Sequence, residues 1–185
     1  MRIITGIAKG TKLETLEGEI TRPTSERTKE AIFSMLQFDI EGKNVLEPFG
    51  GSGQMSLEAL SRGARGAFIS DANENACEII KRNAKKARLF DKTRVVCSDY
   101  VSTLRNLSGR EKFGIVFLDP PYNSNFLSDA LVRLSSGDLV AEGGFVVCES
   151  DSGEPFLCDG FSLVRHAKYG KAFITVLRKD FNDEN

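Results

Sequence analysis

Short apolar runs alternate with longer stretches of mixed polarity along most of this chain, and this alternation predicts its secondary structure. Runs rich in Val, Ile, Leu and Phe are typical of strands that are buried on both faces. Such runs fall at residues 44–46, 67–70, 94–97, 115–118 and 144–148. The stretches between them predict helices at 54–61, 74–88, 101–107 and 127–134. Repeated β-α-β units predict a Rossmann-like, doubly wound α/β fold with a mostly parallel sheet.

The C-terminal part departs from this alternation. Residues 161–166 and 172–177 are both β-like, and the short segment between them leaves no room for a helix. This spacing predicts an antiparallel hairpin that completes the main domain at 43–180. The polar residues 181–185 are expected to form a frayed tail.

Residues 1–42 are expected to form a small N-terminal extension of a hairpin and a helix. The β-like runs at 2–7 and 11–16 predict the hairpin, and Thr24 or Ser25 is placed to cap the helix that follows. One face of that helix collects the side chains of Thr28, Ile32, Met35 and Leu36.

Composition limits the functions open to a chain of 185 residues. Its length suits one domain with a proper core, and its net charge of -1 gives no overall field that attracts nucleic acid. Four cysteines without C-x-x-C spacing and a single His166 predict no metal centre. No apolar run is long enough to span a bilayer, and no signal-peptide core follows Arg2. We therefore expect a reduced, cytoplasmic protein that does not bind membranes.

The strongest chemical signal is the tetrapeptide Asp119-Pro120-Pro121-Tyr122, which follows the buried run at 115–118. The carboxylate of Asp119 and the carbonyl of Pro120 can accept the two N–H groups of an exocyclic amine, and Tyr122 offers a flat face for stacking. Because proline often ends strands, an ordinary strand exit is the competing interpretation. An Asp before the two prolines and a Tyr after them favour the amine-binding role.

A glycine-rich loop, Phe49-Gly50-Gly51-Ser52-Gly53, lies between the first predicted strand and its helix. Glycines there allow a tight turn and a close approach of a ligand to the backbone. The dinucleotide-binding fingerprint is incomplete, since Ser56 stands where it has a third glycine. Glu47 precedes the loop and would repel a pyrophosphate. It suits a ligand with a positive end, such as the amino or sulfonium group of S-adenosylmethionine.

Two further acids follow the next strands. Asp71 ends the second predicted strand, 18 residues after Gly53, where an acid that binds ribose hydroxyls is expected. Asp99, with Tyr100 beside it, follows the third strand and is placed to accept a hydrogen bond from an adenine amine. A helix N-cap is the competing role for each acid.

The glycine loop and the Asp119 tetrapeptide are expected to share one crevice. In a doubly wound sheet the first and fourth strands are neighbours, about 4.8 Å apart, where the strand order reverses. A methyl donor bound at the loop would then face an amine acceptor bound at the tetrapeptide.

These core motifs resemble those of the amino-methyltransferases, which methylate exocyclic amines of nucleobases. Four other motifs are more narrowly similar to the bacterial 16S rRNA guanine-N2 methyltransferases that modify guanine 966. They are Arg2-Ile3-Ile4-x-Gly6, Lys9-Gly10-x-x-Leu13, Arg22-Pro23-Thr24-x-x-Arg27-x-x-Glu30 and Leu57-Glu58-Ala59-Leu60-Ser61-Arg62-Gly63-Ala64. The chain departs from that family at two places. It has Glu47-Pro48-Phe49-Gly50 where the family usually has Asp-Leu-Phe-Ala, and Asp71 where the family usually has Glu. Both changes keep an acidic side chain at the position.

The resemblance implies a class I methyltransferase that uses S-adenosylmethionine to methylate a guanine of 16S rRNA, within an assembled or precursor small subunit. It implies that RNA is held by the N-terminal extension, through Lys9, Lys12, Arg22, Thr24 and Arg27. A second basic cluster is better interpreted as a solvated helix face. It comprises Lys81, Arg82, Lys85, Lys86, Arg88, Lys92 and Arg94.

Other functions share parts of this pattern. A DNA adenine-N6 or cytosine-N4 methyltransferase has the same core motifs, but it usually carries a target-recognition domain for which this chain has no room. Glu47 and the Asp119 tetrapeptide argue against an oxidoreductase that binds a dinucleotide. A catalytically silent RNA-binding module with this fold stays open.

Overall fold

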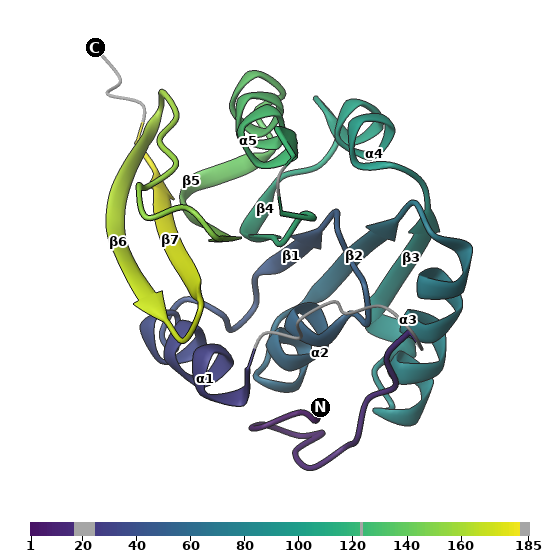
Figure 1. Ribbon diagram of the computed structural model, residues 1–185. Coiled ribbons are helices and arrows are strands. Elements are labelled where there is room, and N and C mark those ends of the chain that lie inside the picture. Colours follow the sequence, from purple (N-terminus) through teal and green to yellow (C-terminus); the bar gives the residue numbers. More distant parts are fainter. Residues whose placement is uncertain (17–24, 123, 182–185) are drawn as a thin grey trace.

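The computed structural model describes residues 1–16, 25–122 and 124–181. Among these residues, the centre of the molecule is a seven-stranded sheet in the order β3-β2-β1-β4-β5-β7-β6 (Figure 1). The strands are β1 (Asn44–Glu47), β2 (Gly66–Asp71), β3 (Thr93–Cys97), β4 (Phe113–Leu118), β5 (Val140–Ser150), β6 (Phe161–Tyr169) and β7 (Ala172–Lys179). β1 to β5 are parallel, and β7 is antiparallel to both β5 and β6. The expected Rossmann-like sheet with its C-terminal antiparallel hairpin is therefore confirmed.

Helices cover both faces of the sheet (Figure 1). One face carries α1 (Glu26–Met35), α2 (Gln54–Ser61) and α3 (Glu74–Lys86), and the other carries α4 (Tyr100–Leu107) and α5 (Phe126–Ser136). A short 3-10 helix, η1 (Phe90–Lys92), leads into β3. This three-layer arrangement explains the apolar runs, because the central strands must bury side chains on both faces.

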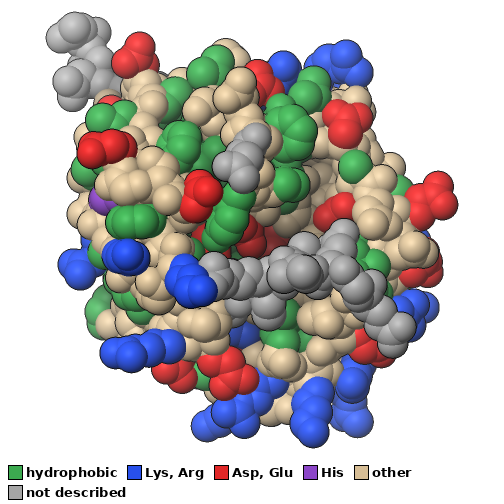
Figure 2. All heavy atoms as spheres, in the orientation of Figure 1, with side chains coloured by type: hydrophobic (Ala, Val, Ile, Leu, Met, Phe, Trp, Pro, Cys, Tyr) green, Lys and Arg blue, Asp and Glu red, His purple; other side chains and the backbone are tan. Residues whose placement is uncertain are grey.

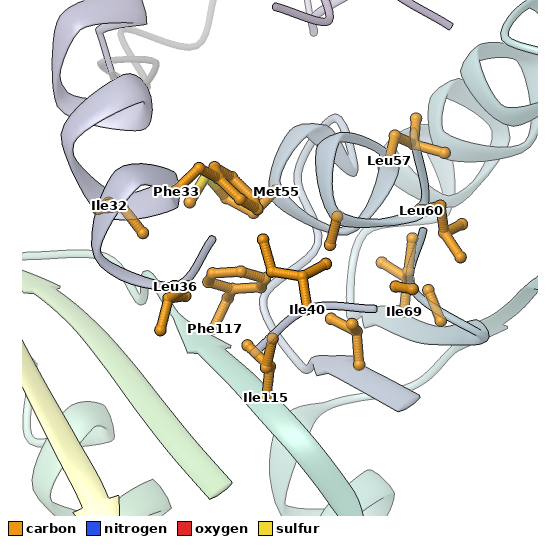
Figure 3. Close-up of a cluster of buried hydrophobic side chains, with 14 of the residues drawn as sticks. Ile32, Phe33, Leu36, Ile40, Met55, Leu57, Leu60, Ile69, Ile115 and Phe117 are labelled. Atoms are coloured by element: carbon orange, nitrogen blue, oxygen red, sulfur yellow. The ribbon is translucent and has the colours of Figure 1, made fainter. Parts of the chain in front are cut away.

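Strand β4 shows how the two core layers are divided. All six of its residues are buried. Ile115 and Phe117 point toward α1 and α2 (Figure 3), whereas Val116 and Leu118 join the layer under α4 and α5. β4 pairs in parallel with β1, with Val45 opposite Ile115. The predicted contact between the first and fourth strands is thus confirmed, and the loops after both strands emerge at the same edge of the sheet.

The N-terminal segment forms fewer strand pairs than the hairpin predicted from the runs at 2–7 and 11–16. Its two arms share one antiparallel bridge, between Arg2 and Lys12, and backbone hydrogen bonds from Ile3 to Thr11, from Gly10 to Ile3 and from Leu13 to Met1. The segment instead packs on the main domain, because Ile3 and Leu13 are buried in the same core layer as α1 and α2. Gly6 makes this approach possible, since a Cβ there would lie 1.8 Å from the carbonyl oxygen of Ser61.

Helix α1 begins where the sequence indicated. Ser25 caps it, and its hydroxyl accepts a hydrogen bond from the Thr28 amide at 3.1 Å. Of the face predicted for this helix, Thr28, Ile32 and Leu36 are buried and Met35 is partly buried, but Lys29 is also fully buried there. Thr24, the other predicted cap, and Arg22 lie outside the described residues.

A buried ion network explains how Lys29 is accommodated. Glu58 on α2 lies 3.3 Å from the Lys29 ammonium and 2.8 Å from the Arg62 guanidinium. The same carboxylate accepts the amides of Ile4 at 2.7 Å and Thr5 at 3.0 Å. Burial lowers the pKa of Lys29, and the charge of Glu58 opposes that effect. Glu58 therefore ties α1 and the N-terminal segment to α2.

Candidate active site

A cavity of about 650 Å³ opens beyond the carboxyl ends of β1, β2 and β4. Figure 2 shows this part of the surface hollowed, with acidic side chains on its floor. Its volume lies within the range of small-molecule sites. The residues expected around the crevice that line it are Glu47, Phe49, Gly50, Gly51, Ser52, Asp71, Asp99, Tyr100, Asp119, Pro120, Pro121 and Tyr122.

The glycine loop presents its backbone to this cavity. Gly51 has a φ of +55°, and a Cβ built on it would have no other atom within 4 Å. Gly50 instead packs against the sheet, where a Cβ would lie 2.6 Å from the side chain of Ile69. Gly53 was expected to contact the cofactor but is not among the lining residues. It has a φ of +74° and starts helix α2.

Glu47 lies at the end of β1 with only 5% of its surface exposed. Its Oε2 accepts the amide of Ser56 at 3.0 Å, within the first turn of α2. Burial raises the pKa of Glu47 to about 7, although the hydrogen bonds from Ser56 and Met55 oppose the shift. A positively charged ligand in the cavity would favour the ionised form of this carboxyl.

Asp71 and Asp99 differ in their structural roles. Asp71 uses both carboxylate oxygens, which accept the amides of Gly51 and Asn73, each at 2.8 Å. Helix α3 is capped by Asn73, so the competing cap role does not apply to Asp71. Asp99 does cap α4, and the hydrogen bond that it accepts from Ser102 lowers its pKa. Both acids line the cavity, and their cofactor contacts stay predictions.

Asp119 follows β4 directly and is exposed to the cavity, while Pro120 is buried. Enclosure by the surrounding protein, followed by the charges of Glu149 and Glu47, raises the pKa of Asp119 well above its usual range. The carboxyl is therefore both accessible and unusually ready to hold a proton. An accessible acid with this property suits proton transfer or hydrogen bonding to a polar substrate group.

Glu149 was not predicted as part of the site. It lies near the end of β5 with 7% of its surface exposed, and its Oε1 accepts the hydroxyl of Tyr122 at 3.4 Å. The strand predicted at 144–148 ended one residue before it. An acid at the end of a buried run, as at Glu47, is the signal that could have identified it.

Aromatic rings form one wall of the cavity. Phe49 and Tyr100 were expected at the site, and their ring centroids are 5.0 Å apart. Phe126, at the start of α5, was not expected. Its ring lies nearly parallel to that of Phe49, at 6.5 Å and 10°. The Tyr100 hydroxyl donates to Asp129 at 2.9 Å, which fixes the ring. Such a wall suits a planar ligand.

The predicted RNA contacts are only partly described. Lys9, Lys12 and Arg27 are exposed and form no ion pair with any described residue. Arg22 and Thr24 lie outside the range that the structure describes. Lys and Arg side chains are numerous over the lower part of Figure 2, where Figure 1 places the N-terminal segment together with α1, α2 and α3.

The second basic cluster is partly neutralised by neighbouring acids. Lys81 pairs with Glu78 at 2.7 Å, and Arg82 pairs with Glu14 at 2.9 Å. Arg94 pairs with an acid on the segment after α4 at 2.8 Å. These ion pairs favour the interpretation of the cluster as a solvated helix face.

Within residues 1–16, 25–122 and 124–181, no group of three His, Cys, Asp or Glu side chains is placed to hold a metal ion. Over the same ranges, none of the helices is both long and apolar enough to cross a membrane.

Relatives of this chain extend along nearly its whole length. Residues 1–178 match the family described as Conserved hypothetical protein 95. A Bacillus subtilis protein named as a candidate rRNA methyltransferase, YlbH, is 33% identical over 182 residues, which are 97% of this chain and 99% of the relative. Ribosomal RNA small subunit methyltransferase D of Escherichia coli K12 is 29% identical over 187 residues, with 100% of this chain and 93% of the relative covered.

A solved structure supports the same relationship. The protein described as a candidate methyltransferase, yhhF, from Escherichia coli superposes on this chain with a TM-score of 0.87 and 30% sequence identity. The match covers 97% of this chain and 98% of the other. The resemblance to small-subunit rRNA methyltransferases noted in the sequence is thereby confirmed.

Proposed function

The chain belongs to the family described as Conserved hypothetical protein 95, and we propose that it methylates the N2 amine of a guanine in small-subunit (16S) rRNA with S-adenosylmethionine as methyl donor. One observation carries this proposal. The glycine loop after β1 and the Asp119 tetrapeptide after β4 line the same cavity. A donor and an acceptor bound at the two loops would meet there.

The donor side of the cavity fits the proposed cofactor. S-adenosylmethionine, when bound, supplies an electrophilic methyl group on a positively charged sulfonium. Glu47 complements that positive end, and the open side of Gly51 leaves room for the ligand against the backbone. Asp71 holds the glycine loop and is placed for ribose hydroxyls, while Phe49 and Tyr100 offer faces for the adenine.

The acceptor side fits an exocyclic amine. The lone pair of guanine N2 is delocalised into the ring, so the amine is a poor nucleophile. The Asp119 carboxylate and the Pro120 carbonyl would accept its N–H groups and stabilise the positive charge that develops on nitrogen. As the N–C bond forms and the S–C bond breaks, nitrogen loses one proton, which Asp119 can receive. The cavity would add to the rate by holding the amine of the target base in line with the methyl group to be transferred.

RNA recognition is assigned to the N-terminal region. The base must leave its stack to enter the cavity, which favours a loop nucleotide. Lys9, Lys12, Arg22, Thr24 and Arg27 would hold the flanking phosphates, and the exposure of the described cations among them supports this role. We infer that the substrate is an assembled or precursor small subunit, as the family resemblance suggests.

The test maps the product of the purified protein. Small subunits and naked 16S rRNA from cells without the gene are incubated with labelled S-adenosylmethionine, and the modified nucleotide is identified by mass spectrometry. N2-methylguanine at one position is the expected product. Duplex DNA is offered in parallel, and methylation of adenine N6 or cytosine N4 there would favour a DNA methyltransferase. Cofactor binding without transfer to any substrate would favour a silent RNA-binding module.

A further inference from the structure

Glu149 is a buried acid at the active site to which the reaction described above gives no role. β4 and β5 are parallel, and Leu118 pairs with Cys148. The next residues along the two strands, Asp119 and Glu149, are therefore neighbours at the carboxyl ends of β4 and β5. Cys148 faces the layer under α4 and α5, and the alternation of strand side chains turns Glu149 to the opposite face. Opposite Glu149 on β7 lies the buried Ile174.

A carboxylate in this position is costly to the fold. Its strand neighbours on the same face, Val147 and Ile174, are apolar and belong to the core. Burial of an acid among such residues opposes folding unless polar groups compensate for the lost water. The Tyr122 hydroxyl is one such group, since it donates to Glu149 at 3.4 Å. An apolar side chain would satisfy the packing alone, so the acid calls for a functional explanation.

We propose that Glu149 is a positioning residue for methyl transfer, whose carboxylate anchors the Tyr122 hydroxyl and so fixes the tyrosine ring beside Asp119. The proposal deepens the proposed function and rests on it. The ring is attached to the tetrapeptide at one end and held by β5 at the other. A target base then packs against a face that is already in place, which reduces the ordering required at the transition state.

The charge of Glu149 has a second, measurable consequence. It raises the pKa of Asp119, after the larger effect of enclosure by the surrounding protein and together with Glu47 on β1. The Tyr122 hydroxyl, on the loop itself, is a further titratable group beside Glu149. Replacement of Glu149 by a neutral residue should therefore lower the pKa of Asp119. Removal of the Tyr122 hydroxyl should not.

The experiment compares single-turnover methylation by Glu149→Leu, Glu149→Gln, Tyr122→Phe and the Glu149→Leu/Tyr122→Phe double variant. Because a hydrogen bond to a charged group is lost, Glu149→Leu and Tyr122→Phe should each slow transfer by roughly ten- to a hundredfold. The double variant should be no slower than the slower single variant, since both changes remove one shared interaction. S-adenosylmethionine affinity should be unchanged. Glu154→Gln, an exposed acid on the loop after β5, is the matched control.

A pH profile separates anchoring from a purely structural role. Glu149→Gln keeps an acceptor oxygen and is the variant of choice if Glu149→Leu fails to fold. In this variant the acid limb of the pH–rate profile should move to lower pH. In Tyr122→Phe the limb should stay in place. An unshifted limb in Glu149→Gln, or rate losses that add in the double variant, would overturn the proposal.

A spectroscopic readout keeps this test independent of the proposed function. The chain has three tyrosines, so the ¹³C-labelled ring signal of Tyr122 can be assigned by its loss in Tyr122→Phe. That signal should shift in Glu149→Leu and stay unchanged in Glu154→Gln. If the wild-type protein methylated no RNA but the signal shifted, the function would be wrong and the anchor right. An unshifted signal in an active, folded Glu149→Leu protein would refute the anchor alone.

Discussion

Cofactor affinity should rise as the pH increases through neutrality, because Glu47 must be ionised to complement a cationic ligand. Burial raises the pKa of this carboxyl from 4.5 to about 7. The ionised fraction is then about one-tenth at pH 6 and about nine-tenths at pH 8. Since the apparent affinity scales with the competent fraction, S-adenosylmethionine should bind about tenfold more tightly at pH 8 than at pH 6.

Isothermal titration calorimetry at pH 6, 7 and 8 measures this effect directly. Repeating each titration in two buffers of different ionisation enthalpy reports the protons released on binding. Glu47→Gln should bind more weakly and lose most of the pH dependence, which also controls for titration of the ligand's own amine. In Asp119→Asn the affinity for S-adenosylmethionine should keep the pH dependence that Glu47 causes. A wild-type affinity that is flat from pH 6 to pH 8 would refute the role assigned to Glu47.

The same pKa shift makes the ligand-free protein less stable as the pH rises, whereas it makes cofactor binding tighter. The unfolded chain loses the Glu47 proton near pH 4.5, whereas the folded protein retains it up to about pH 7. Stability therefore falls as the pH rises through this window, by roughly 3 kcal/mol from this group alone. Urea unfolding at pH 5 and pH 7.5 should show a smaller loss in Glu47→Gln than in the wild type.

Three further variants test other parts of the account. Gly51→Val should abolish S-adenosylmethionine binding in calorimetry, because its side chain would strain a φ of +55° and enter the ligand's path; undiminished binding would refute this placement. Glu58→Ala should lower the free energy of unfolding by about 3–5 kcal/mol in urea titrations, since it leaves the Lys29 ammonium buried with the Arg2 carbonyl but without its ion-pair partner; a loss below 1 kcal/mol would contradict the network's role. Lys9→Ala with Lys12→Ala should weaken RNA binding and reduce its salt dependence in filter-binding assays, while cofactor affinity stays constant.

Much of the fold and of the cavity lining could be predicted from the sequence, because local pattern and topology determine them. Strands such as β4 are buried on both faces, so each reads as an uninterrupted apolar run. In a doubly wound sheet the loops after the first and fourth strands meet, which places Glu47 and Asp119 at one cavity without knowledge of any side-chain contact.

Contacts between distant segments could not be predicted in this way. The burial of Lys29 depends on Glu58, which lies on another helix, and no periodicity within α1 reveals such a partner. Phe126 joins the aromatic wall only because α5 begins beside Phe49 in space. The N-terminal hairpin has one bridge and a few backbone hydrogen bonds between its arms, and it is held by the burial of Ile3 and Leu13 on the domain core, which no local pattern reveals.

Single-turnover methylation of small-subunit rRNA by Asp119→Ala tests the central claim most directly. If Asp119 accepts the target amine, the rate should fall by about a hundred- to a thousandfold, which corresponds to about 2.7–4 kcal/mol of transition-state stabilisation. S-adenosylmethionine affinity should stay nearly unchanged, and Asp119→Asn should lose less activity because its amide oxygen still accepts a hydrogen bond. A fully active Asp119→Ala protein would contradict the account and would show that the tetrapeptide is only the exit of β4.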